Sequence, residues 1–201
     1  KTFIQLVKCH RLHWNHFLDK IVINFKPPYW YHDNIKLSDD DLDLLKSEID
    51  NLREQKFAKD KMHVSTFFLE KYERPENKYL DLYKGIVEDI TKNVGIYHKV
   101  TYDVSYWTQL YDEGMFHNPH HHAEINPYWE STISWVHFLD VPKQKCFRFT
   151  DTRGNTLVPD EQNNGDIICF PSWVWHEVLP NESKMRRLVT SGNIKVTHYD
   201  D

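Results

Sequence analysis

From about residue 98 to the C-terminus, apolar and polar residues alternate with a period of two, which is the pattern of half-buried β-strands. Turn-forming Gly, Asn, Asp and Pro residues interrupt this alternation at short intervals. The predicted strands between these turns are residues 99–104, 106–111, 131–139, 146–150, 166–170, 176–179 and 187–198. Many short strands in succession are typical of a β-sandwich or a closed barrel.

Helices are predicted only before this region. Ser38 is followed by three aspartates, and this pattern predicts the start of a helix. A serine N-cap accepts a hydrogen bond from a free backbone amide, and acidic side chains are stabilised near the positive end of the helix dipole. Helical apolar spacing predicts a first helix through about residue 53 and a second over 78–93, and an alternating stretch at 20–26 predicts an earlier strand. We expect an α+β, mainly β, single domain over residues 1–201, with 1–97 packing on a barrel core formed by 98–201.

The composition is that of a globular protein with a hydrophobic core. Hydrophobic residues make up 40% of the 201 residues and charged residues 27%. The formal net charge of -5 argues against nucleic acid as a partner. No apolar stretch is long enough to span a membrane, no signal-peptide pattern opens the chain, and the 3 cysteines form no CxxC pair. We therefore expect a cytoplasmic protein with no membrane partner.

Histidine is the outlier in this composition, and the cluster at 117–122 is the strongest candidate for a metal site. Residues i and i+2 of a strand point to the same side, so His120, His122 and Glu124 compete for two positions around one metal ion. His176 begins another predicted strand and completes the set. Two histidines and one carboxylate leave coordination positions open, as in non-haem Fe(II) oxygenases, although zinc accepts the same ligands.

The segment Gly165-Asp-Ile-Ile-Cys-Phe-Pro-Ser-Trp-Val-Trp-His176-Glu-Val-Leu-Pro-Asn resembles the C-terminal half of the 2-oxoglutarate/Fe(II)-dependent dioxygenase superfamily. The branch that it most resembles is the prolyl-hydroxylase-like one, which includes small bacterial and phage oxygenases. The resemblance covers roughly residues 105–196 and is specific in its second half. It implies a double-stranded β-helix, a jelly-roll or cupin-like barrel, with N-terminal supporting helices.

The same resemblance implies a hydroxylase that uses Fe(II), 2-oxoglutarate and O2, with ascorbate as an optional addition, and releases succinate and CO2. The substrate is a peptide or a small molecule, and peptidyl proline is the first one to try.

The resemblance also implies the metal ligands. The family's HxD/E motif matches His122-Ala-Glu124, and the distal histidine matches His176. Two departures bear on this match. Glutamate replaces the commoner aspartate at position 124, and the small-oxygenase branch typically shows His-x-His, which here is His120-x-His122 and leaves Glu124 out of the set.

The residue that grips the far carboxylate of 2-oxoglutarate in the family matches Arg187, and a guanidinium suits this role because it bonds a carboxylate through two nitrogens. The adjacent Arg186 is the alternative anchor, but Arg187 shares strand parity with Ser191, as on the family's inward face.

Tyr111 lies where the family often has a tyrosine that reaches the co-substrate, and the alternative for it is a core aromatic. Relatives often carry tyrosines where this chain has His137 and Phe138, so one hydroxyl contact is missing or is supplied by His137.

Two other interpretations remain open. A cupin-type metal-binding protein would use His120, His122 and His176 without 2-oxoglutarate, and it would not require Arg187. A metal-free β-barrel that serves as a binding module would leave these histidines on its surface.

Overall fold

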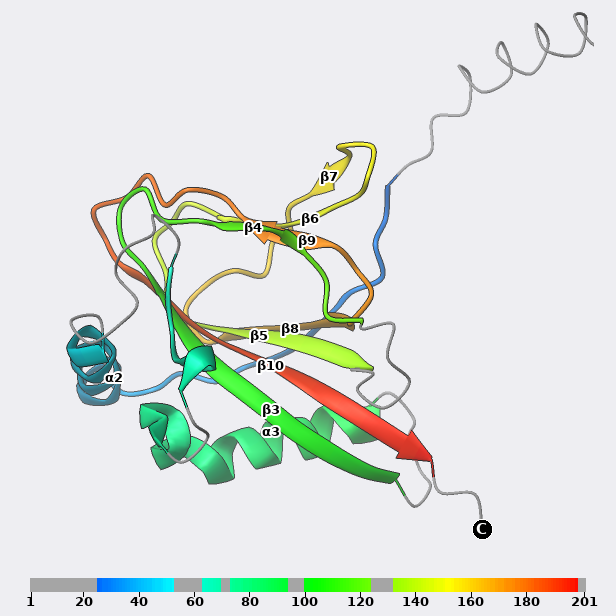
Figure 1. Cartoon of the computed structure of the whole chain (residues 1–201), viewed down its shortest axis with the longest axis horizontal. Coiled ribbons are helices and arrows are strands. Elements are labelled where there is room, and N and C mark those ends of the chain that lie inside the picture. Colours follow the sequence, from blue (N-terminus) through cyan, green and yellow to red (C-terminus); the bar gives the residue numbers. More distant parts are fainter. Residues whose placement is uncertain (1–24, 53–62, 70–72, 94–99, 124–131, 199–201) are drawn as a thin grey trace, which may run out of the picture.

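The computed structural model describes residues 25–52, 63–69, 73–93, 100–123 and 132–198. Two antiparallel sheets face each other, and the helices within these described ranges lie against the larger one (Figure 1). The larger sheet has the order β1-β8-β5-β10-β3-β2, with β1 (Trp30–Asn34), β2 (Val64–Ser65), β3 (Val100–Tyr111), β5 (Ile133–Asp140), β8 (Asp166–Pro171) and β10 (Arg187–His198). The smaller sheet has the order β4-β9-β6-β7, with β4 (His117–His120), β6 (Phe147–Thr150), β7 (Thr156–Leu157) and β9 (His176–Val178).

From β3 onward the chain crosses repeatedly between the two sheets. Strands β3, β5, β8 and β10 belong to the larger sheet, and the segments between them contribute β4, β6, β7 and β9 to the smaller one. This winding is the double-stranded β-helix, and the mainly β jelly-roll fold expected from the sequence is confirmed.

The prediction of separate strands at 99–104 and 106–111 is wrong, because both belong to β3. Strand β3 pairs with β10 without a shift in register from Tyr111 opposite Arg187 to Val100 opposite His198. The sequence did not indicate β4 as a strand, since His-Asn-Pro-His has no period-two alternation and includes a proline. The strand predicted at 20–26 lies almost wholly outside the described residues.

The predicted helices are present. Helix α2 (Asp39–Leu52) begins after Ser38, whose hydroxyl accepts the amide of Asp41 at 3.2 Å, as expected for an N-cap. Helix α3 (Leu80–Asn93) follows the short turns η2 (Thr66–Phe68) and η4 (Pro75–Tyr79) and lies along the outer face of the larger sheet (Figure 1). No helix in the described part of the chain is long and apolar enough to cross a membrane.

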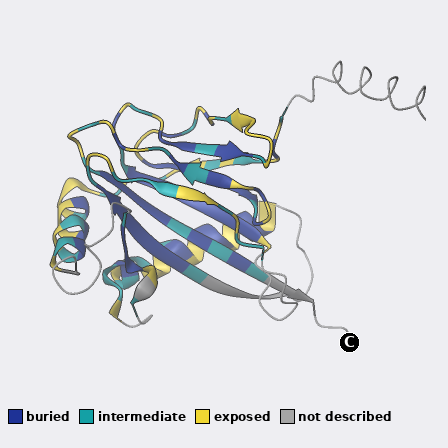
Figure 2. Cartoon of the chain, turned by 45° about the horizontal axis from the view of Figure 1, so that its top comes forward, coloured by how far each residue is buried: buried dark blue, intermediate teal, exposed yellow. Residues whose placement is uncertain are grey.

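The two faces of the larger sheet have different roles. Along β5, Val136 and Phe138 belong to the core between the sheets, whereas Ile133 and Trp135 pack with α3. Buried residues accordingly run along the central strands, and exposed ones gather in the loops, on the outer helix faces and on the edge strands β4 and β7 (Figure 2). The functional groups described below lie on the face that points between the sheets.

Candidate active site

Three histidines converge at one end of the smaller sheet. His120 ends β4 and His176 begins β9, and the two are direct partners in the antiparallel ladder. His122 follows β4, and its backbone amide donates to the carbonyl of Ser172 at 2.8 Å. One ring nitrogen from each of His120, His122 and His176 lies within 4.8 Å of the others, so the three imidazoles can bind one metal ion.

This arrangement corrects one prediction and leaves another untested. The sequence suggested that one strand carries positions 120 to 124, but β4 ends at His120 because the amides of His122 and Ala123 both donate to the Ser172 carbonyl instead of continuing the ladder. Glu124 lies outside the described residues, so its place as a ligand remains a prediction.

Backbone carbonyls define the orientation of two of these imidazoles. Nδ1 of His120 lies 2.8 Å from the carbonyl oxygen of Asn118, and Nδ1 of His176 lies 3.0 Å from that of Val174. A carbonyl oxygen only accepts, so Nδ1 is the donor in both rings and Nε2 keeps a free lone pair. Metal-binding histidines commonly show this second hydrogen bond, because it holds both the tautomer and the ring orientation.

The cluster is electrically neutral near pH 7. Burial, together with the neighbouring imidazoles of His120 and His121, lowers the pKa of His122 to about 3. Burial likewise lowers the pKa of His120, and it lowers that of His176 well below the ordinary value. Neutral imidazole is the form that coordinates a metal, so little proton release would oppose binding at neutral pH.

Arg187 occupies the opposite end of the same space between the sheets. Only 1% of this residue is exposed, and its guanidinium carbon lies 5.0 Å from the ring centre of Tyr111 and 5.7 Å from that of Phe138. Neither the terminal nitrogens of Arg187 nor the hydroxyl of Tyr111 make a hydrogen bond of good geometry in the described structure, although the two groups lie near enough to interact electrostatically. Burying a guanidinium whose terminal nitrogens have no acceptor is costly, so this end of the space fits an anionic ligand.

The two ends belong to one pocket. Ser191 lies on the same face of β10 as Arg187, and its hydroxyl donates to Oε1 of Gln109 at 3.1 Å. The residues that line the pocket are Trp107, Gln109, Tyr111, His117, His120, His122, Ser134, Trp135, Val136, Phe147, Phe170, His176, Val178, Arg187, Val189, Ser191 and Gly192. The structure therefore brings the sequence-predicted residues His120, His122, His176, Arg187, Tyr111 and Ser191 to one pocket.

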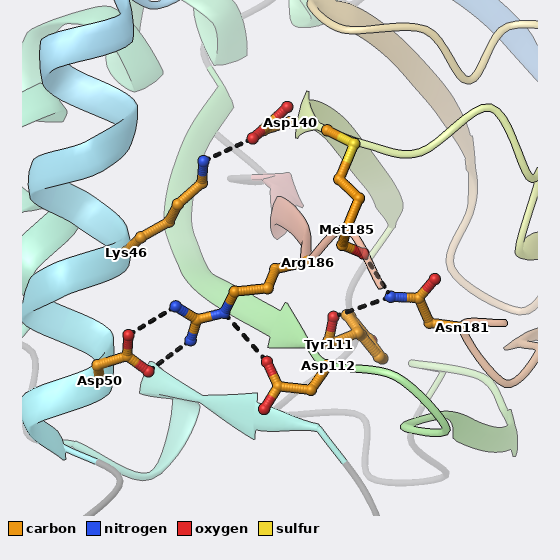
Figure 3. Close-up of polar contacts among 8 residues, drawn as sticks. All are labelled: Lys46, Asp50, Tyr111, Asp112, Asp140, Asn181, Met185 and Arg186. Atoms are coloured by element: carbon orange, nitrogen blue, oxygen red, sulfur yellow. Dashed lines mark hydrogen bonds and ion pairs between the residues drawn. The ribbon is translucent and has the colours of Figure 1, made fainter. Parts of the chain in front are cut away.

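Two alternatives raised by the sequence lie outside this pocket. Arg186 points away from it and pairs with Asp50 and Asp112 (Figure 3). His137 faces α3, where its Nε2 lies 2.7 Å from the carbonyl oxygen of Ile35, so it does not supply the missing hydroxyl contact.

Sequence reasoning missed a column of aromatic rings along the pocket. The His117 ring lies 4.0 Å from that of His120 and 4.2 Å from that of His63, measured between ring centres. The His63 ring in turn lies 5.0 Å from that of Tyr111, so the column connects the histidine cluster with the Arg187 end. Strand parity with Tyr111 could have indicated Gln109, but no local pattern indicates His63, which precedes a two-residue strand at the sheet edge.

Solved structures share this fold at low sequence identity. A Pseudomonas putida prolyl-4-hydroxylase is 20% identical, with 84% of this chain and 91% of that chain covered and a TM-score of 0.54. A viral collagen prolyl hydroxylase from Paramecium Bursaria Chlorella virus-1, solved as a 2OG complex, is 17% identical, with 86% and 98% covered and a TM-score of 0.56. The non-heme alpha ketoglutarate dependent epimerase SnoN from nogalamycin biosynthesis is 14% identical, with 83% and 77% covered and a TM-score of 0.58.

No protein-family model matches the chain, and no curated protein matches it. At these identities the likeness shows the fold. The chain has the double-stranded β-helix of 2-oxoglutarate/Fe(II) oxygenases, including the prolyl-hydroxylase-like ones, and the resemblance seen in the sequence is confirmed at the level of fold.

Proposed function

We propose that this protein is a non-haem Fe(II)- and 2-oxoglutarate-dependent dioxygenase that hydroxylates its substrate. The observation that carries the proposal is the pocket itself, with three convergent imidazoles at one end and an unpartnered, buried guanidinium at the other. The first group of residues suits a metal ion and the second suits a dicarboxylate, and both line the same space.

His120, His122 and His176 would hold the iron, since their rings converge, are neutral near pH 7 and, in two of the three, present Nε2. Three protein ligands leave positions for a chelating co-substrate and for oxygen. Glu124 is the competing ligand predicted from the sequence, and the Fe(II) affinities of the His120→Ala and Glu124→Ala variants distinguish the two.

Arg187 would bind the far carboxylate of 2-oxoglutarate through its two terminal nitrogens, and the hydroxyls of Tyr111 and Ser191 would complete this end. When bound, iron and 2-oxoglutarate supply the oxidation, with succinate and CO2 as co-products. The chain's own residues orient the co-substrate, and buried Phe147 and Phe170 help to exclude water.

Peptidyl proline is the first substrate to test, because two of the structures that share the fold are prolyl hydroxylases. A small molecule is the second class, since SnoN is an epimerase of nogalamycin biosynthesis. We place the protein in the cytoplasm, an inference supported by the free, buried thiols of Cys146 and Cys169.

The alternative is a cupin-type metal-binding protein that uses His120, His122 and His176 without 2-oxoglutarate. The all-histidine cluster is compatible with it. It gives no reason for burying Arg187 without a partner, and we therefore rank it second.

A succinate-release assay with and without Fe(II), run against prolyl peptides and small molecules, tests the proposal. We expect succinate only when both Fe(II) and 2-oxoglutarate are present, and no turnover by His176→Ala with the fold intact by circular dichroism. His121→Ala is the matched control, because the His121 ring packs against Trp175 outside the metal cluster, at 4.6 Å between ring centres. Metal uptake with no binding of 2-oxoglutarate by calorimetry would instead establish the cupin-type function.

A further inference from the structure

Two consecutive arginines, Arg186 and Arg187, lie at the start of β10, and only Arg187 enters the pocket. Arg187 points between the sheets, while Arg186 points outward toward α2 (Figure 3). Because neighbouring residues of a strand point to opposite sides, a slip of one residue would exchange the two guanidinium groups. The two side chains are chemically alike, so their surroundings must select Arg187 for the pocket.

The outward arginine is held by two carboxylates. Nε of Arg186 donates to Oδ1 of Asp112 at 3.0 Å, and Nη1 donates to Oδ2 of Asp50 on α2 at 2.6 Å, with Nη2 bonded to the other oxygen of Asp50 (Figure 3). Asp112 directly follows Tyr111, just as Arg186 directly precedes Arg187. The Arg186–Asp112 ion pair therefore joins the two chain segments one residue beyond the Tyr111–Arg187 pair, where the β3–β10 ladder ends.

A buried amide reinforces the same end. The side-chain amide of Asn181 donates to the carbonyl oxygen of Tyr111 at 3.2 Å and to that of Met185 at 2.9 Å (Figure 3). Asn181, which does not line the pocket, thus connects the backbone of Tyr111 with the backbone just before Arg187.

We propose that Asp50 and Asp112 are positioning residues for the co-substrate anchor: by holding Arg186 outward they keep the end of the β3–β10 ladder in the position from which Arg187 and Tyr111 enter the pocket. This inference rests on the proposed function. The side chains of Arg186, Asp50 and Asp112 are 32%, 40% and 27% exposed, and pairs at such exposure contribute little to global stability. Their effect is therefore expected in the orientation of the anchor more than in the unfolding free energy.

The chain offers a matched control on the same helix. Lys46 lies one turn before Asp50, and its Nζ lies 2.6 Å from Oδ2 of Asp140 at the end of β5 (Figure 3). This second ion pair also ties α2 to the larger sheet, but it involves no residue of β3 or β10, and its Asp140 lies opposite Leu188 in the β5–β10 ladder. Lys46→Met thus loosens the helix without releasing Arg186.

The test is calorimetric titration of 2-oxoglutarate into the Mn(II)-loaded, full-length protein, with Mn(II) affinity measured separately. We expect Asp50→Asn and Arg186→Gln to weaken 2-oxoglutarate binding about fivefold or more while Mn(II) affinity stays within about twofold. Lys46→Met should bind 2-oxoglutarate like the unaltered protein, and Arg186→Lys, which keeps the charge but not the fork, should give an intermediate affinity.

Unchanged 2-oxoglutarate affinity in both Asp50→Asn and Arg186→Gln would overturn the inference, and so would an equal loss in Lys46→Met. Should Arg186→Gln fail to fold, Asp50→Asn alone decides, since it alters no residue of the sheets. Failure of the proposed function is distinct from these outcomes, because the unaltered protein would then bind Mn(II) but no 2-oxoglutarate.

Discussion

Arg187 and Tyr111 are direct partners in the β10–β3 ladder, and the Arg187 guanidinium carbon lies 5.0 Å from the centre of the Tyr111 ring. Both side chains end in buried polar atoms that have no hydrogen-bond partner in the described part of the chain. Each such group costs about 1–3 kcal/mol in the protein alone, and more when it is charged. A carboxylate that accepts hydrogen bonds from both groups would remove this cost, and this is why the pair suits ligand binding better than stability.

Arg187→Met should weaken the binding of 2-oxoglutarate without changing the binding of the metal. It keeps an unbranched, apolar side chain but removes the buried charge, so we expect 2-oxoglutarate to bind about 100-fold more weakly, which corresponds to about 3 kcal/mol. Calorimetry on the Mn(II)-loaded protein measures this loss. Mn(II) affinity serves as the control and should remain unchanged, since the histidine cluster lies at the other end. Unaltered 2-oxoglutarate binding would rule out Arg187 as the anchor.

Tyr111→Phe should lower affinity without lowering stability. The variant removes a buried hydroxyl that has no partner in the described structure, so the free energy of unfolding should stay the same or rise by up to about 1 kcal/mol. The affinity for 2-oxoglutarate should fall about fivefold, because one hydrogen bond to a carboxylate is lost. Urea unfolding and calorimetry give the two values. A clear loss of stability with unchanged affinity would make Tyr111 a core aromatic only.

The metal ligands can be assigned by three alanine variants. If the histidine set binds the metal, His120→Ala and His122→Ala should each lower Fe(II) affinity by at least about tenfold, while Glu124→Ala should change it little. Anaerobic competition with a chelator measures these affinities. A larger loss in Glu124→Ala than in His120→Ala would show that the carboxylate, and not His120, completes the set.

Acid should destabilise the fold through His137, which packs away from the metal cluster. Burial lowers the pKa of His137 to about 4, from an ordinary value of 6.5. Between these values the unfolded chain binds a proton that the folded chain does not, so the stability present above pH 6.5 declines as the pH falls, by about 1.4 kcal/mol per pH unit for this group.

Urea unfolding of the metal-free protein at pH 7, 5.5 and 4.5 checks this expectation. His137→Gln keeps a side-chain donor near the Ile35 carbonyl but cannot titrate. As the pH falls, the free energy of unfolding of this variant should therefore decline less steeply than that of the unaltered protein. The difference between the two slopes should correspond to one bound proton. Parallel pH dependences of the two proteins would show that His137 already carries its proton, or does not titrate, in the folded state.

Local signals in the sequence predicted a large part of this fold. Ser38 and the aspartates after it predicted the start of α2, and the alternation at 187–198 predicted β10, because caps and strand parity depend only on nearby residues. The same locality explains the failures. Strand β4 has no alternation, and it is a strand because β9 lies beside it.

The sequence by itself determined the mainly β class, the candidate metal ligands at positions 120, 122, 124 and 176, and the presence of an arginine at the start of the last strand. Only the tertiary structure decided that His120 faces His176, that the His63 ring packs against those of His117 and Tyr111, and that Arg187 turns inward while Arg186 pairs with Asp50. The physical reason is that each of these relations joins segments far apart in the chain, and their contacts depend on the register between strands, which periodicity alone does not specify.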